Sequence, residues 1–296
     1  MERKKASDFP PEVLGIFDEY VHGLIDRRAF LARAAKYAVG GMTAGMLLDA
    51  LNPRFAEAQQ VARDDARLEA RAVEYASPLG SGTMRGYLAR PAKPAGKLPG
   101  VLVIHENRGL NPHIEDVARR FALANYLALA PDALTPLGGY PGDEDRARDL
   151  FAKLDRLQAR EDFLAALAFL EKHPGCSGKV GAVGFCWGGG VVGFLATRAP
   201  SLAAGVPFYG GQPPEEEVAH IRAPLLIHHA EQDERINAGI PAFERALQAA
   251  KVRYQLFTYP GTQHGFHNDT TPRYDQTAAA QAWKRTLAFL EQHLRG

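Results

Sequence analysis

The fold of this chain is decided by the stretch Lys179-Val180-Gly181-Ala182-Val183-Gly184-Phe185-Cys186-Trp187-Gly188-Gly189-Gly190. Its first half predicts a short buried strand, and the residues after Cys186 predict an apolar helix. Cys186 then stands on a sharp turn, where Gly184 and Gly188 let neighbouring backbone pass without a clashing Cβ. The turn also places the thiol at a helix N-terminus, where the helix dipole favours a thiolate. Because cysteine also serves as a small buried hydrophobe, this spacing alone leaves both a structural and a nucleophilic role open.

Size and composition indicate a globular protein with a sizeable core. The chain has 296 residues, of which 46% are hydrophobic and 23% are charged. Its formal net charge is +1 and it has no long basic run, so nucleic acid is not an expected partner. Cys176 and Cys186 are its two cysteines, which argues against a disulfide scaffold. No Cys/His spacing resembles a structural zinc site, and we expect no metal and no cofactor.

From residue 66 to residue 296 the pattern alternates between strands and helices. Two strands joined by a glycine turn predict an antiparallel entry hairpin over 68–90. Later apolar runs predict strands buried on both faces, at 101–105, 126–130, 179–185, 203–209, 224–230 and 254–259. Helices are predicted between them, at 114–124, 143–159, 161–173, 189–198, 241–250 and 274–294. This alternation predicts an α/β domain with a mostly parallel central sheet and helices on both faces.

Partners for a cysteine nucleophile stand in loops after two of these strands. A nucleophile needs a base, and the base needs an orienting acid. Asp233 follows the strand at 224–230, with Glu231 and Glu234 as alternative acids, and His264 follows the last strand. The order nucleophile, acid, histidine is that of the α/β-hydrolase fold, whose nucleophile also sits in a Gly-x-Ser-x-Gly turn. We therefore predict an α/β-hydrolase fold with a catalytic triad of Cys186, Asp233 and His264.

A second motif, His105-Glu106-Asn107-Arg108-Gly109, follows the first buried strand directly. In an α/β-hydrolase this loop supplies one oxyanion-hole amide, and the residue after the nucleophile supplies the other. The predicted donors are the backbone N–H groups of Asn107 and Trp187. Glu106, at the end of a strand and beside the thiol, is predicted to be a functional carboxylate rather than a surface acid.

These motifs together resemble the dienelactone hydrolase family over about residues 69–296. The resemblance is carried by the Gly-x-Cys-x-Gly turn, the His-Glu-Asn loop, Gln232-Asp233 and the Gly-x-x-His-Gly-Phe motif at 261–266. Members are carboxymethylenebutenolidases that hydrolyse enol lactones such as 4-carboxymethylenebut-2-en-4-olide to maleylacetate, without metal or organic cofactor. The resemblance implies attack by the Cys186 thiolate, loss of an enolate, and release of the acyl-enzyme by water. It also implies that Glu106 interacts with the cysteine and helps to activate it.

Family enzymes that take dienelactone bind its carboxylate with arginines, one on the charged helix and one shortly after the catalytic histidine. Arg146 and Arg148 are the helix candidates here, whereas the first arginine after His264 is Arg273. His267 stands near the expected position, either as a plain loop histidine or in contact with substrate. The expected activity is hydrolysis of a small carboxylic ester or lactone. The alternatives are a thioesterase, a broad small-ester hydrolase, or a non-catalytic, redox-responsive protein.

Residues 1–65 differ from the rest of the chain. Asp26-Arg27-Arg28-Ala29-Phe30-Leu31 matches a twin-arginine export motif, and an apolar run at 38–48 and Ala56-Glu57-Ala58 follow, as in a cleavable signal. The run is too short to span a membrane. We predict export to the periplasm by this route. The alternative is a cytoplasmic protein whose N-terminal helices pack on the main domain, since apolar residues over 9–24 have helical spacing.

Overall fold

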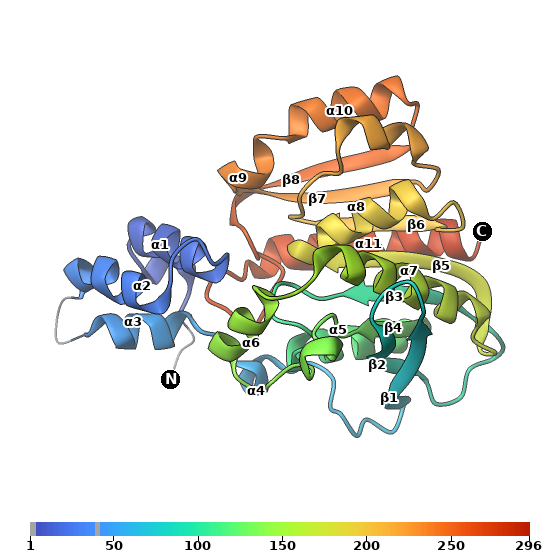
Figure 1. Cartoon of the computed structure of the whole chain (residues 1–296), viewed down its shortest axis with the longest axis horizontal. Coiled ribbons are helices and arrows are strands. Elements are labelled where there is room, and N and C mark those ends of the chain that lie inside the picture. The colour runs from blue at the N-terminus through green and yellow to red at the C-terminus, as the bar shows by residue number, and fades with distance from the viewer. Residues whose placement is uncertain (1–3, 39–41) are drawn as a thin grey trace.

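The computed structural model describes residues 4–38 and 42–296, which build an eight-stranded sheet flanked by helices (Figure 1). The strand order is β1-β2-β4-β3-β5-β6-β7-β8. The strands are β1 (Leu68–Ser77), β2 (Gly82–Pro91), β3 (Leu98–Ile104), β4 (Leu127–Pro131), β5 (Cys176–Phe185), β6 (Ala204–Phe208), β7 (Leu225–Gln232) and β8 (Tyr254–Gln263). β1 and β2 form an antiparallel hairpin, and β2 also pairs antiparallel with β4. Every other pairing in the sheet is parallel. The predicted α/β-hydrolase fold is confirmed.

Helices cover both faces of this sheet. They are α5 (Pro112–Leu123), α6 (Glu144–Phe151), α7 (Arg156–Lys172), α8 (Trp187–Arg198), α9 (Glu234–Asn237), α10 (Ile240–Ala249) and α11 (Gln276–Leu294). Because successive side chains of a strand point to opposite faces, β3 contributes to two cores. Leu102 and Ile104 pack with residues of α7, α8 and α10, while Val101 and Val103 pack with residues of α5 and α11. Cys186, Asp233 and His264 directly follow the carboxyl ends of β5, β7 and β8.

The predicted helix at 143–159 is wrong in its extent. The structure has two helices there, because α6 ends at Phe151 and the carboxylate of Asp155 accepts hydrogen bonds from the backbone N–H groups of Leu157 and Gln158. An aspartate in this position caps a new helix instead of continuing the old one. Leu157 lies in the first turn of this new helix and is 71% exposed, while Leu154, just before it, is buried.

The first part of the chain is helical and has its own core. We call residues 4–38 and 42–58 the N-terminal unit; its helices are α1 (Pro11–Val21), α2 (Arg27–Ala34), α3 (Ala44–Leu51) and α4 (Phe55–Ala58). Its core is formed by apolar residues of α1, α2 and α3, among them Val13, Phe17, Tyr20, Phe30, Leu47, Leu48 and Leu51. Residues 39–41 of the predicted apolar run lie outside the described residues.

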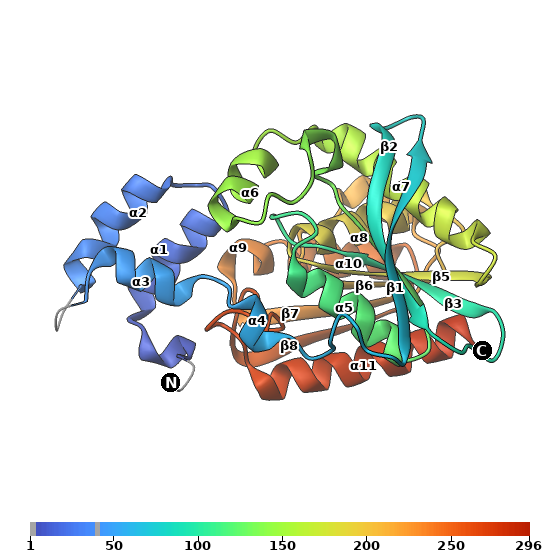
Figure 2. The same cartoon turned by 90° about the horizontal axis from the view of Figure 1, so that it is seen from below.

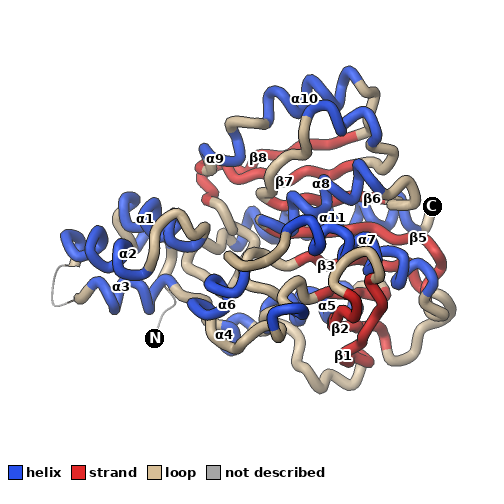
Figure 3. Tube along the Cα trace, viewed as in Figure 1, coloured by secondary structure: helices blue, strands red, loops and turns tan. Residues whose placement is uncertain are grey.

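The helices α1, α2 and α3 stand at one end of the sheet, next to α6 and α9 (Figures 2 and 3). The side chains of Tyr20 and Arg27 both hydrogen-bond the carboxylate of Asp145 on α6. Within the described ranges, no helix combines the length and the apolar character that a membrane crossing requires. Export and cleavage of this part of the chain stay predictions.

Candidate active site

Cys186 occupies the predicted turn between β5 and α8. Its backbone has φ 54° and ψ −114°, a conformation that residues other than glycine rarely adopt. A Cβ on Gly184 would lie 2.1 Å from the carbonyl oxygen of Gly188, and one on Gly188 would lie 2.4 Å from the carbonyl oxygen of Ile104. Both glycines are therefore required by backbone contacts, which confirms the steric reason predicted for them. The thiol is buried, with the residue 8% exposed.

Asp233 and His264 meet beside this thiol. Asp233 caps α9, and its Oδ2 lies 2.5 Å from Nδ1 of His264. The two side chains are 3% and 6% exposed, so water screens their interaction little. Because Nδ1 is engaged by the carboxylate, Nε2 is the nitrogen left to act as a base. That Nε2 is buried and has no hydrogen-bond partner in the described part of the chain.

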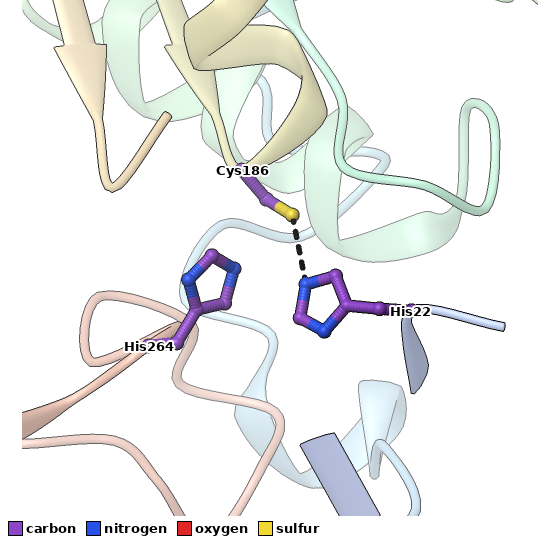
Figure 4. A group of neighbouring side chains, drawn as sticks. All are labelled: His22, Cys186 and His264. Carbon is purple, nitrogen blue, oxygen red and sulfur yellow. Dashed lines mark hydrogen bonds between the residues drawn. The ribbon is translucent and has the colours of Figure 1, made fainter. Parts of the chain in front are cut away.

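A second imidazole reaches the same thiol from the N-terminal unit. His22 directly follows α1, and its Nε2 lies 3.6 Å from Sγ of Cys186 (Figure 4). Its ring stands edge-on to that of His264, with 4.9 Å between the ring centroids. Sequence reasoning missed His22. The one available signal was an aspartate four residues earlier, Asp18, which is the spacing of neighbours on a helix.

The charges at this site favour a thiolate. Burial by itself would raise the pKa of Cys186, but the positive charge of His264 and the hydrogen bond to His22 outweigh burial and lower the pKa to about 6. Burial would lower the pKa of His264, yet the charge of the neighbouring sulfur and the bond to Asp233 raise it. A buried thiolate facing an imidazolium is the reactive form of a cysteine nucleophile.

Glu106 forms its side-chain hydrogen bonds with Asn268 and Tyr209. Its Oε2 accepts a hydrogen bond of 2.8 Å from the side-chain amide of Asn268, and its Oε1 accepts one of 3.4 Å from the hydroxyl of Tyr209. Throughout residues 4–38 and 42–296, no hydrogen bond joins Glu106 to Cys186. The carboxylate is thus held by two neighbours, one of which, Tyr209, lines the cavity above the nucleophile.

The two predicted oxyanion donors border this cavity. Trp187 is the first residue of α8, and the first N–H groups of a helix have no intrahelical acceptor. Asn107 lies in the loop after β3, and its side-chain amide donates a 2.8 Å hydrogen bond to the carbonyl of Val21. This bond ties the oxyanion loop to the end of α1. Both residues line the same space as Cys186.

The cavity has a volume of about 480 Å³ and is positively charged. Its charged lining residues are arginines, namely Arg108, Arg148, Arg156 and Arg235, and among the described residues no aspartate or glutamate lines it. Arg148, one of the two predicted carboxylate binders, is therefore in the cavity. Arg146 is not among the lining residues.

His267 lies in the core behind the nucleophile. It is 3% exposed and stacks on Phe185, with 5.3 Å between the ring centroids. Burial lowers its pKa to about 3, so the ring is neutral. The structure brings Cys186, His264 and Arg148 together in the cavity lining, with Asp233 bonded to His264 outside it, and it also places His267 outside the lining.

One group of side chains offers atoms that metals bind. Nitrogens of His22 and His264 and the sulfur of Cys186 lie within 4.8 Å of one another. Histidine nitrogens and cysteine thiolates are both ligands that zinc takes in proteins. However, Nη2 of Arg235 lies 2.9 Å from Nε2 of His22, and three further arginines but no described carboxylate line the cavity around these atoms, so the surrounding charge opposes a cation. The donor set therefore does not fit a resident cation, and we derive no chemistry through one.

Fold and site together define an α/β-hydrolase. The dienelactone hydrolase family model matches residues 84–294, and a second model, YqhI-like, matches residues 1–36. A protein of Escherichia coli (strain K12) named "Putative carboxymethylenebutenolidase" is 31% identical over 73% of this chain and 85% of its own. A Bradyrhizobium protein named "Probable 2-oxo-3-(5-oxofuran-2-ylidene)propanoate lactonase" is 34% identical, over 71% of this chain and 90% of its own.

Comparison with solved structures supports the same family. A dienelactone hydrolase-like promiscuous phosphotriesterase, P91, from metagenomic libraries superposes with a TM-score of 0.65 at 27% identity, covering 77% of this chain and 99% of its own. The chain belongs to the dienelactone hydrolase family, and it is a hydrolase enzyme. Such a family implies a small-molecule substrate.

Proposed function

We propose that this protein hydrolyses a small anionic carboxylic ester or lactone through the thiolate of Cys186. The observation that carries the proposal is the buried Asp233–His264 pair beside a cysteine on a strained turn. The lowered pKa of the thiol supports it, since a thiolate and not a thiol is the nucleophile. The lactonase and carboxymethylenebutenolidase names of two relatives support the substrate class.

The proposed reaction has two halves. The thiolate attacks the carbonyl carbon, and the backbone N–H groups of Asn107 and Trp187 hold the oxyanion that forms. The carbon–oxygen bond then breaks while His264 gives its proton to the leaving oxygen, which leaves an acyl group on Cys186. In the second half, water gives a proton to His264 and attacks the acyl carbon. The carbon–sulfur bond then breaks, which releases the carboxylic acid and regenerates the thiolate of Cys186.

The lining of the cavity supports an anionic substrate. Arg156 and Arg235 are exposed at its rim, and in the described ranges neither forms an ion pair with a carboxylate. Guanidinium groups bind carboxylates through parallel N–H donors. These two groups near the nucleophile are the proposed anion site. They take the place of the arginine that family enzymes carry shortly after the catalytic histidine.

Steady-state hydrolysis of dienelactone and of p-nitrophenyl acetate tests the proposal. We expect Cys186→Ala to lower turnover of both by at least about 10³-fold, because the variant has no nucleophile. Cys176→Ala is the matched control, since Cys176 is the other free, buried cysteine and lies at the far end of β5. Mass spectrometry of wild-type protein quenched during turnover should find an acyl group on Cys186.

Two results would contradict the proposal in different ways. Wild-type rates in Cys186→Ala would exclude the cysteine as nucleophile. Cysteine-dependent turnover of the neutral ester, without preference for dienelactone, would instead exclude the anionic substrate and favour a broad small-ester hydrolase.

A further inference from the structure

Two aspartate–histidine pairs converge on one thiol, and Figure 4 shows their two imidazoles beside Cys186. Asp233 and His264 come from loops after β7 and β8, near the C-terminus of the chain. Asp18 lies on α1 and His22 directly follows it, and Nδ1 of His22 lies 3.2 Å from Oδ2 of Asp18. In both pairs a carboxylate engages Nδ1. His22 is therefore oriented toward Cys186 in the same way as His264, the predicted base.

Asp18 is fixed in the ionised state. Its Oδ1 accepts a 3.1 Å hydrogen bond from Arg273, and although burial opposes ionisation, His22 and Arg273 hold the pKa of the carboxyl below its usual range. The Nδ1 of His22 also lies 2.8 Å from the backbone carbonyl oxygen of Asp18. Both neighbours of Nδ1 are acceptors, so Nδ1 carries the proton and Nε2 presents its lone pair.

Arg235 indicates the same tautomer. A guanidinium only donates hydrogen bonds, and its Nη2 lies 2.9 Å from Nε2 of His22, so this nitrogen must be an acceptor. The charged or titratable groups that face the His22 ring are Asp18 from α1, Arg235 from α9, and Cys186 and His264 from the domain. Arg235 is exposed, so its guanidinium can turn away when Nε2 takes a proton.

His22 is held in place by the oxyanion loop. The carbonyl of Val21 accepts hydrogen bonds from the side chains of Asn107, at 2.8 Å, and Arg108, at 3.1 Å. Arg108 is buried, and a buried donor left without a partner is costly. The residue next to His22 is thus anchored by the loop that carries a proposed oxyanion donor. This anchoring argues against a chance approach of an unattached segment.

We propose that His22 is a second catalytic base for Cys186, supplied by the N-terminal unit and oriented by Asp18. The inference rests on the proposed thiolate chemistry. In the step it describes, the S–H bond of Cys186 breaks and an N–H bond forms at Nε2 of His22. The products are a thiolate and an imidazolium whose charge faces the Asp18 carboxylate. His22 and His264 share the thiol proton, and the N-terminal unit contributes to the active site.

The test is the pH dependence of alkylation of Cys186 by iodoacetamide in the full chain, which requires no substrate turnover. In His22→Gln the side chain keeps a polar group near Nε2 but has no basic nitrogen. We expect the alkylation rate at pH 6 to fall about fivefold, the effect of raising the thiol pKa from about 6 by about one unit. Asp18→Asn should also lower the alkylation rate at pH 6, but by a smaller factor. Glu19→Gln is the matched control, because Glu19 neighbours Asp18 on α1 but pairs with Arg33.

Alkylation profiles of His22→Gln and Asp18→Asn that superpose on the wild-type profile would overturn the inference. If His22→Gln does not fold, as judged by its thermal transition, Asp18→Asn decides by the same criterion. A shifted profile in a protein that turns over neither ester would contradict the proposed function and still support the role of His22 at the thiol. The failures of the two proposals are therefore distinguishable.

Discussion

Removing the side chain of Phe30 should detach the N-terminal unit from the active site while the sheet domain stays folded. Phe30 is fully buried, and its ring centroid lies 6.3 Å from that of Phe17 and 5.4 Å from that of Tyr20. Replacing a buried phenylalanine by alanine costs about 3–5 kcal/mol. A core this small supplies about 3–5 kcal/mol on its own. Phe30→Ala therefore removes most of the stability of the unit, whose core is separate from the two cores of the sheet.

Two measurements on Phe30→Ala follow this local unfolding. Limited trypsin digestion should cut first within the unit, at arginines such as Arg28 and Arg33, and leave a stable fragment that contains the sheet. The alkylation profile of Cys186 should move toward that of His22→Gln, because unfolding withdraws His22 from the thiol. Leu24→Ala is the control, since Leu24 belongs to the same unit but is 67% exposed.

Each contrary result would refute a different step of this reasoning. Digestion at the wild-type rate would show that the unit does not depend on the Phe30 core. Early digestion with an unchanged alkylation profile would show that the thiol does not depend on the unit. Loss of the whole thermal transition would show that the unit and the sheet domain unfold together.

Two further predictions concern the cavity and the thiol. Arg156→Ala and Arg235→Ala should raise KM for dienelactone about tenfold, the equivalent of about 1.4 kcal/mol, and leave KM for p-nitrophenyl acetate unchanged. Equal changes for both substrates would remove the role in anion binding. The lowered thiol pKa means that the active thiolate is present above about pH 6 and lost as the pH falls through it, so kcat/KM for the neutral ester should rise through that pH. A midpoint near the ordinary value of about 8.5 would contradict the charge argument for Cys186.

The positions of Cys186, Asp233 and His264 were predictable because their signals are local. Gly184 and Gly188 are required by contacts of the turn itself, and Asp233 and His264 each follow a strand whose apolar run is visible in the sequence. The break before α7 was also visible in principle, since Asp155 is a capping residue, but the continuous apolar pattern was given more weight. The fold class was predictable despite this missed boundary, because it depends on the alternation of strands and helices and not on where any one of them ends.

The positions of His22 and Arg235 had no such signal. A lone histidine at the end of a helix, far in sequence from the nucleophile, carries no mark of its destination. Its place beside Cys186 depends on tertiary contacts, namely the bonds of the Val21 carbonyl to Asn107 and Arg108. Arg235 follows α9's capping residue by two positions, and its role depends on which side of that short helix faces the cavity. Neither fact can be read from spacing.

The residues that predict an export signal also stabilise the folded N-terminal unit. Asp26, directly before the arginine pair, caps α2 by accepting a hydrogen bond from the backbone N–H of Ala29. Leu47 and Leu48, at the end of the apolar run, are buried in the core of the unit. A signal peptide and a small helical core need the same apolar residues, so composition cannot separate them. The role proposed for His22 does separate them, because cleavage after Ala58 would remove one of the two imidazoles from the thiol. Cleaved export and a catalytic His22 therefore exclude each other, and evidence for His22 at the thiol of the mature protein would count directly against cleavage.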